Sequence, residues 1–229
     1  MKFSIISSGW NCEQFIPDWY NSLISQKVNW QAFVLDDGST DKTYRRLENL
    51  SDSRLHLFKN PNNKGAAYSR WKLIQQCDGD VLVFLDLDDY ILSGSLLSLK
   101  KPYKEGKLMT VGSYRMDRGR AKNEFYNRYE IDQNRFLKGT FKCPPLRTFS
   151  SQCINFLKED DFKINRQWIK TCTDVALMFP VLKALRFDDI AVMSKIMYHY
   201  RYRPKSQSSY RFDKLPVMNA LRIKHGKKN

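Results

Sequence analysis

The sequence predicts an α/β protein built on a Rossmann-like, mostly parallel central sheet flanked by helices. Strand-like and helix-like patterns alternate over the first hundred residues, as they do in βαβ units. Two short apolar runs, residues 31–35 and 81–85, each lead directly into a cluster of aspartates. Such runs are typical of strands buried on both faces, and ligands of these folds bind where the strands end. The two acidic clusters are therefore expected at one edge of the sheet.

The first half of the chain divides into alternating strands and helices. Strands are predicted at residues 3–7, 31–35, 55–58 and 81–85. Helices are predicted between them, and the third covers residues 66–77. Asn11 is expected to cap the first helix, and Ser39 or Thr40 the second, because these side chains accept hydrogen bonds from unpaired helical N–H groups.

The half after residue 100 is less regular. A polar, basic segment that runs through Arg128 predicts a loop. The other expected elements are a strand at 108–114, helices near 152–157 and over 173–185, and strands at 190–193 and 196–202. Because there is no internal repeat and no low-complexity linker, residues 1–229 are expected to form one domain with two halves, 1–100 and 101–229.

Composition favours a globular protein. Of the 229 residues, 42% are hydrophobic, which allows a substantial core, and no apolar stretch reaches the ~20 residues of a membrane helix. The N-terminus lacks a signal-peptide cleavage pattern, so a cytoplasmic location is the default expectation. The five cysteines are scattered and form no C-x-x-C pair, which argues against a zinc ribbon or a disulfide framework.

The net charge of +15 suits anionic partners: nucleoside diphosphates, phospholipid surfaces or nucleic acid. Much of the excess lies late in the chain, where a charge run also fits a simple solvated face. Residues 215–223 form a weakly amphipathic segment with cations around it. We expect this segment to dock on the domain or on an anionic membrane surface.

The second acidic cluster gives the most specific site prediction. Asp86 and Asp88 are expected to point the same way, with Leu87 turned inward, because side chains of an extended segment alternate. Clustered carboxylates repel one another unless a cation or hydrogen-bond donors offset their charge. A hard divalent ion, with a phosphorylated substrate completing its shell, fits this pattern and points to nucleotide-sugar chemistry.

The motifs of the first half carry a family resemblance. They lie in order at residues 4–11 (SIISSGWN), 36–41 (DDGSTD), 63–65 (NKG) and 84–89 (FLDLDD). In order and spacing they resemble the motifs of family 2 glycosyltransferases, which are inverting enzymes with the GT-A fold. The resemblance covers roughly residues 3–100 well, and looser matches follow at 173–178 and 198–208. Two departures are Thr173, where an acidic residue is usual, and Ser7-Ser8-Gly9-Trp10 in place of a Pro-x-Tyr pattern.

The resemblance implies roles for the first acidic cluster and the residues near it. One of Asp36 and Asp37 would cap the following helix beside Ser39, and the second Asp would accept the imide N–H of a uracil-like base. Ser8 and Trp10 would lie at the nucleotide sugar, with the ring of Trp10 against the base or ribose. Core packing is the alternative for Trp10. Lys64 would contact base or phosphate, or remain a solvated lysine.

For the second cluster, the family implies that Asp86 meets the ribose and shares in metal binding. Asp88 would hold Mn²⁺ or Mg²⁺, which bridges the diphosphate and acts as a Lewis acid. Asp89 would be a supporting partner or a helix cap. His199 is a further candidate metal ligand, as a late histidine is in some relatives, although a lone histidine in a strand is more often structural.

Asp174 is the candidate general base, because inverting transfer needs one carboxylate to take the proton of the acceptor hydroxyl. The alternative is that Asp174 has no catalytic role and is an ordinary acidic residue at the start of a helix. Asp160 and Asp161 are rivals, although they sit in a charged run that predicts exposure. Arg201 or Arg203, in a segment where cations alternate, would supply bidentate hydrogen bonds to the diphosphate.

The sequence thus predicts a metal-dependent inverting glycosyltransferase that moves a sugar from a nucleoside diphosphate sugar to a hydroxyl of a glycan or other acceptor. A UDP-linked sugar is the favoured donor. Residues 1–100 would bind the donor and residues 101–229 the acceptor. A sugar-nucleotide-binding protein of the same fold without catalysis is one alternative. A basic nucleic-acid-binding protein is another, and it predicts binding that falls steeply with salt. A nucleotidyltransferase is less favoured because the chain lacks the expected Gly-rich phosphate loop.

Overall fold

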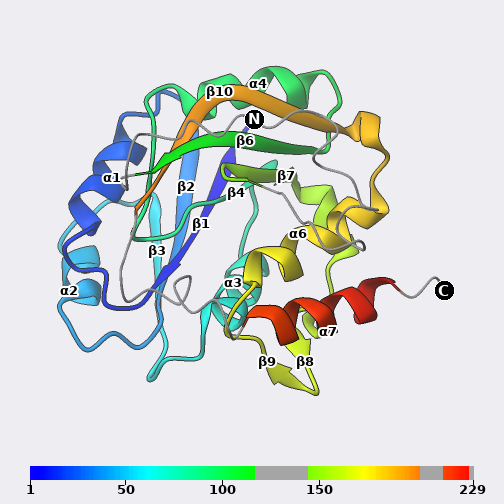
Figure 1. Ribbon diagram of the computed structural model, residues 1–229. Helices are drawn as coiled ribbons and strands as arrows, with labels where there is room; N and C mark the ends of the chain where they lie inside the picture. The colour runs from blue at the N-terminus through cyan, green and yellow to red at the C-terminus, as the bar shows by residue number, and fades with distance from the viewer. Residues whose placement is uncertain (117–143, 202–213, 227–229) are drawn as a thin grey trace.

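A twisted central sheet with helices on both faces forms the body of the protein (Figure 1). The structure is a computed structural model, and it describes residues 1–116, 144–201 and 214–226. The sheet contains β1 (Phe3–Gly9), β2 (Trp30–Asp36), β3 (Leu55–Lys59), β4 (Val81–Phe84), β5 (Tyr90–Ile91), β6 (Met109–Met116), β7 (Arg147–Ser150) and β10 (Ile190–Tyr200).

The strands of this sheet follow the order β3-β2-β1-β4-β7-β6-β10-β5. The first four are parallel, as expected for βαβ units, and β10 is parallel to β6. The strand β7 runs antiparallel between β4 and β6, so it joins the two halves of the sheet. The predicted α/β class with a mostly parallel sheet is confirmed.

The helices divide the core into two apolar clusters, one on each face of the sheet. They are α1 (Ile16–Ile24), α2 (Thr43–Glu48), α3 (Ala66–Ile74), α4 (Ser95–Lys104), α6 (Thr173–Ala184) and α7 (Lys214–Gly226). One cluster contains Leu73 of α3 and Phe179 of α6, and the other contains Trp19 of α1 and Leu99 of α4. Because neighbouring strand residues point to opposite faces, Ile5 and Ile6 of β1 belong to different clusters.

The first two helices begin differently from the sequence prediction. Asn11 has a φ of 52° and its side-chain Nδ2 donates to Thr40 Oγ1 at 3.2 Å, so it ties two loops together and does not cap α1. The helix α1 begins at Ile16, with a proline in its first turn. At α2 the backbone N–H of Thr43 bonds to Asp41 Oδ1 at 2.9 Å, so neither Ser39 nor Thr40 provides this contact.

The second half also differs in detail. Residues expected as a helix near 152 form a 3₁₀ helix, Ser151–Phe156, and the two strands expected after 190 are one strand, β10. Several short elements were not predicted from the sequence. They are the strands β5 and β7, a hairpin of β8 (Lys163–Ile164) and β9 (Gln167–Trp168), and 3₁₀ turns at Glu159–Phe162 and Phe187–Asp189. The loop predicted through Arg128 lies outside the described residues.

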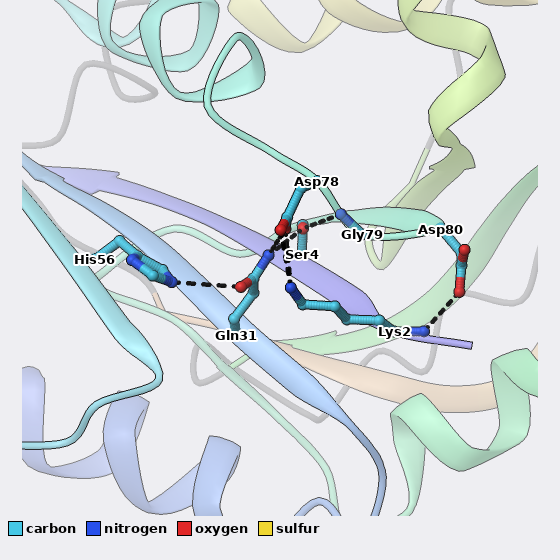
Figure 2. Close-up of polar contacts among 7 residues, drawn as sticks. All are labelled: Lys2, Ser4, Gln31, His56, Asp78, Gly79 and Asp80. Atoms are coloured by element: carbon cyan, nitrogen blue, oxygen red, sulfur yellow. Dashed lines mark hydrogen bonds and ion pairs between the residues drawn. The ribbon is translucent and has the colours of Figure 1, made fainter.

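Polar side chains fix the amino ends of the parallel strands (Figure 2). Gln31 of β2 donates through Nε2 to Ser4 Oγ of β1 at 3.2 Å and to Asp78, and its Oε1 lies 3.3 Å from His56 Nε2 of β3. Lys2 Nζ donates to the same Asp78 carboxylate at 3.0 Å. These contacts join β1, β2, β3 and the turn before β4, which fixes the positions of the opposite strand ends.

Candidate functional site

A cleft of about 740 Å³ opens where β1, β2 and β4 end. Both halves of the chain contribute to its walls. The lining includes Ser8, Gly9, Trp10, Asp37, Gly65, Arg70, Asp86, Asp88, Asp89, Tyr114, Arg147, Lys170, Thr173, Asp174, Tyr200, Lys214 and Met218. The location agrees with the rule that ligands of open α/β sheets bind at the carboxyl ends of the strands.

Three carboxylates gather in the turn that follows β4. Asp86, Asp88 and Asp89 each place an oxygen within 4.8 Å of the others, and they are the group among the described residues that could hold a metal ion. Asp86 and Asp88 are half-buried, and Leu87 between them is fully buried. The predicted alternation along this segment is therefore observed.

The third carboxylate of this turn, Asp89, is fastened to β10. Its Oδ2 accepts a hydrogen bond from Tyr198 Oη at 2.5 Å, and its Oδ1 accepts one from the backbone N–H of Arg201 at 2.7 Å. Burial, together with the nearby Asp88 and Asp86 carboxylates, raises the pKa of Asp89 well above its ordinary value. Asp89 thus anchors the turn, in agreement with the supporting role expected for it.

The donor set fits a hard divalent cation. Carboxylate oxygens are the ligands that Mg²⁺ and Mn²⁺ prefer, and Asp86 and Asp88 present theirs at the cleft. An ion held there would also offset the repulsion among three closely spaced carboxylates.

The first acidic cluster splits into a structural and a cleft-facing residue. Asp36 is buried, and its carboxylate accepts hydrogen bonds from the backbone and hydroxyl of Ser39. Asp37 lines the cleft and accepts from Asn60 Nδ2 at 2.7 Å and from the backbone N–H groups of Lys64 and Gly65 at 2.9 and 2.8 Å. A carboxylate has about four lone-pair positions, so one remains for a ligand donor.

Of the other residues expected to bind the donor, two line the cleft and one does not. Ser8 and Trp10 line the cleft, and Trp10 is 47% exposed, so its ring is not a core residue. Lys64 is exposed and is not among the cleft-lining residues; only its backbone takes part, through Asp37.

Asp174 lies in the first turn of α6 and lines the cleft from the second half of the chain. Its side chain is 38% exposed, and Arg147 Nη2 of β7 donates to its Oδ2 at 3.2 Å. The rivals lie elsewhere: Asp160 pairs with Lys224 at 2.7 Å and Asp161 accepts from the backbone of Lys158. Among the three, only Asp174 lines the cleft.

Arg70 is a cleft residue that the sequence reasoning missed. It projects from α3, and its nitrogens donate to Asp86 Oδ1 at 2.6 Å and to Thr173 Oγ1 at 2.5 Å. A signal for it existed, because Arg70 falls on the buried face of α3 with Ala67, Leu73 and Ile74. A cation on an apolar helical face requires a buried partner. Arg147, also missed, follows a turn-rich passage that carried no such signal.

The side chains of two expected site residues, His199 of β10 and Arg201 directly after this strand, do not line the cleft. The guanidinium of Arg201 pairs with Asp18 of α1 and lies 5.2 and 5.1 Å from the ring centres of Phe15 and Tyr90. His199 accepts a hydrogen bond from Arg115 at its Nδ1 and stacks on Tyr90. Neither lines the cleft, and His199 is not part of the carboxylate group, so the expected diphosphate and metal contacts have no support in this geometry. Arg203 lies outside the described residues.

Sequence comparison identifies the family. The profile described as "Glycosyl transferase family 2" matches residues 4–163. The chain belongs to glycosyl transferase family 2. The predicted resemblance is confirmed, and the matched region contains both aspartate clusters and Arg70.

Individual relatives of this family 2 chain are named glycosyltransferases. The Escherichia coli protein WfgD, a UDP-Glc:alpha-D-GlcNAc-diphosphoundecaprenol beta-1,3-glucosyltransferase, is 30% identical over 66% of this chain and 55% of its own length. Staphylococcus aureus TarS, a poly(ribitol-phosphate) beta-N-acetylglucosaminyltransferase, is 37% identical over 40% of this chain and 17% of its own. The chain spans about half the length of the curated relatives that match it over most of its residues.

Solved structures show the same fold. A crystal structure of S. aureus TarS in complex with UDP-GlcNAc superposes with a TM-score of 0.78 at 21% identity, covering 98% of this chain and 66% of that one. A mannosyltransferase from Pyrobaculum calidifontis in complex with GDP-Man and Mn²⁺ gives a TM-score of 0.68 at 13% identity, covering 99% and 64%. The predicted GT-A fold is confirmed. Among the described residues, no helix combines the length and apolarity needed to cross a membrane.

Proposed function

We propose that this family 2 chain is a glycosyltransferase that moves a sugar from a nucleoside diphosphate sugar to an acceptor hydroxyl with inversion. A UDP-linked sugar is the favoured donor. One observation carries the proposal: the carboxylates Asp86 and Asp88 and the carboxylate Asp174 line the same cleft from opposite halves of the chain. We further infer that residues 1–229 act as one domain, which is supported by a single sheet that draws strands from both halves.

The donor would lie over the ends of β1, β2 and β4. The remaining acceptor position of Asp37 suits the imide N–H of uracil, and the exposed ring of Trp10 offers a flat face to base or ribose. The TarS complex with UDP-GlcNAc supports a UDP-linked donor for a chain of the same fold.

Asp88 and Asp86 would hold Mn²⁺ or Mg²⁺, which when bound neutralises charge on the leaving nucleoside diphosphate. Asp174 would take the proton from the acceptor hydroxyl as that oxygen attacks the anomeric carbon. The bond from this carbon to the diphosphate breaks in the same displacement, so the configuration inverts and no covalent nucleophile is needed. Arg147 would hold the Asp174 carboxylate in place.

The acceptor side of the cleft carries cations. Lys170 and Lys214 line the same cleft as Asp174 and Arg147. The acceptors in the names of WfgD and TarS contain a diphosphate or phosphate groups. A glycan acceptor that carries phosphate near the receiving hydroxyl would meet this wall with favourable charge.

The test is a screen of nucleoside diphosphate sugars for hydrolysis and transfer, with Mn²⁺ or with EDTA, on the wild-type chain and on Asp174→Asn. The substitution keeps the shape of the side chain and removes the proton acceptor. Transfer is expected to fall by about 10²–10⁴-fold while donor binding is unchanged. Near-normal transfer by the variant would exclude Asp174 as the base.

A non-catalytic sugar-nucleotide-binding protein remains the second candidate, because the Asp174 carboxylate is already engaged in a 3.2 Å ion pair with Arg147. Wild-type chain that binds UDP-sugar with Mn²⁺ yet transfers to no acceptor would select this candidate.

A further inference from the structure

The helix α7 docks on the domain with one face and leaves another face uncovered. Leu221 and His225 are buried, and the ring of His225 packs edge-on against Phe179 of α6. On the outer side, Leu215 is 62% exposed and Ile223 is 64% exposed. These two lie on one side of the helix, because eight residues are slightly more than two turns.

The same helix is strongly basic. Residues 214–226 include Lys214, Arg222 and Lys224 and no carboxylate. Lys224 is paired with Asp160, so part of this charge is offset locally. The neighbouring β8–β9 hairpin adds Arg166, which is exposed at the tip of the turn. Large exposed apolar side chains among cations are the pattern of segments that lie on anionic lipid.

The uncovered face adjoins the mouth of the cleft. Lys214 and Met218 line the cleft, and Leu215 follows Lys214 directly. In Figure 1, α7 lies together with β8 and β9 at the lower right of the molecule, at the end away from α4. Contacts between α7 and β8, which include a 3.0 Å hydrogen bond from Lys224 Nζ to the carbonyl of Lys163, agree with this placement.

We propose that the outward face of α7 and the tip of the β8–β9 hairpin form a docking surface for an anionic phospholipid bilayer. Leu215 and Ile223 enter the boundary between headgroups and acyl chains, and Arg222 of α7 and Arg166 meet lipid phosphates. A stable protein partner buries roughly 800 Å² on each side, which two separated apolar side chains do not provide. A bilayer needs only such a shallow apolar contact with added charge attraction.

This surface is distinct from the donor site, so its test does not depend on sugar transfer. The full chain is sedimented with vesicles of phosphatidylcholine alone and of phosphatidylcholine with phosphatidylglycerol. Binding is expected only with phosphatidylglycerol, and it should weaken as salt rises. A chain that does not bind phosphatidylglycerol vesicles at low salt overturns the proposal.

Variants locate the surface. Leu215→Ser with Ile223→Ser is expected to weaken vesicle binding about tenfold or more, whereas Leu97→Ser, which removes a 55% exposed leucine of α4, leaves it unchanged. Arg166→Glu is expected to weaken it at least about fivefold, and Lys27→Glu, in an exposed loop beyond α1, much less. Because all five substituted residues are exposed, unchanged melting temperatures verify the fold.

Two results would contradict the assignment. Equal losses in the test and control variants would mean that vesicle binding does not depend on this face. A concentration-dependent dimer that is lost in the Leu215→Ser, Ile223→Ser chain, without vesicle binding by the wild type, would make a second copy the occupant and overturn the membrane proposal.

Discussion

Asp86 and Thr173 are joined through a single guanidinium, that of Arg70. Asp86 belongs to the carboxylate turn after β4, and Thr173 is the first residue of α6, immediately before Asp174. Arg70 is largely buried, so its two partners satisfy a charge that has little contact with water. The contact therefore fixes the proposed metal-binding side of the cleft relative to the proposed base.

Removing one end of this bridge should separate stability from catalysis. Thr173→Val keeps the shape of the side chain and leaves one Arg70 donor unpaired, which costs about 1–3 kcal/mol of unfolding free energy. We expect transfer to fall while the apparent affinity for the donor changes little, because Asp174 loses its alignment and Asp86 keeps its partner. Unfolding in urea and separate kcat and KM values for the donor measure this.

Ser69→Ala is the matched control for Thr173→Val. Ser69 precedes Arg70 on α3, is fully buried, and its Oγ has no hydrogen-bond partner among the described residues. Loss of transfer in this variant to the same degree would show that general loosening of α3, and not the bridge, is responsible.

Asp88 should control a metal-dependent effect of nucleotide binding. UDP is expected to raise the melting temperature far more with Mn²⁺ than with EDTA, because an ion held by Asp88 and Asp86 would offset the charge of the diphosphate. Asp88→Asn should remove that difference and leave the fold intact, whereas Asp174→Asn should retain it. Equal stabilisation by UDP in EDTA would rule out the metal role of Asp88.

Gly9 sets the position of the carboxylate turn. A Cβ at this residue would lie 2.8 Å from Leu87 Cβ and 2.8 Å from Cys12 Sγ, so Gly9→Ala must displace the segment between Asp86 and Asp88. Overpacking of this kind costs about 1–3 kcal/mol. We expect the variant to bind UDP with Mn²⁺ at least tenfold more weakly, as measured by titration calorimetry.

Gly106→Ala tests whether this effect is local. A Cβ there meets nothing within 4 Å, but the φ of +82° makes the substitution strained. It should lower stability without altering UDP binding in the presence of Mn²⁺. Similar weakening in both variants would point to a global effect of instability.

His225 predicts a loss of stability in mild acid. Burial, followed by the charges of Lys224 and Lys183, lowers the pKa of His225 to about 4 in the folded protein, against about 6.5 when unfolded. The unfolded chain then binds more protons between these values, so stability falls as the pH drops from about 6.5 towards 4. The difference corresponds to about 3 kcal/mol at most. Urea unfolding at a series of pH values measures it.

His225→Phe isolates this contribution, because a phenyl ring preserves the edge-on contact with Phe179 and does not titrate. The comparison is needed because two neighbouring carboxylates also have shifted pKa values. Burial raises the pKa of Asp161, which favours the folded state as the pH falls and so opposes the effect of His225. Lys224 lowers the pKa of Asp160, which acts in the same direction as His225. We expect the variant to lose less stability between pH 6.5 and 4 than the wild type. Parallel pH profiles would assign the acid sensitivity to another group.

The carboxylate turn could be predicted from the sequence because its signal is local. A buried apolar run delivers Asp86 and Asp88, and the two-residue period of an extended segment places both on one side of Leu87. The partners of these residues were not predictable in the same way. Arg70 and Arg147 reach the cleft through packing between elements distant in sequence, which no local period reports.

The end of β10 shows how irregular strand pairing decides which side chains face the cleft. The pairing of β10 with β6 shifts register between Val192 and Ile196 and again between Ile196 and Tyr198. Irregularities of this kind re-aim the side chains that follow. Tyr200 consequently lines the cleft, while His199 stacks on Tyr90 and Arg201 turns towards Asp18 of α1.

The antiparallel strand β7 has a consequence for how the protein is made. It lies between β4 and β6, so one edge of β4 stays unpaired until the ribosome has delivered residues 147–150. At roughly 5–20 residues per second, that interval lasts roughly 3–13 s. During it, the apolar run Val81–Phe84 presents an open strand edge, which is a template for aggregation. The yield of folded chain is therefore expected to depend on chaperones that cover this edge during synthesis.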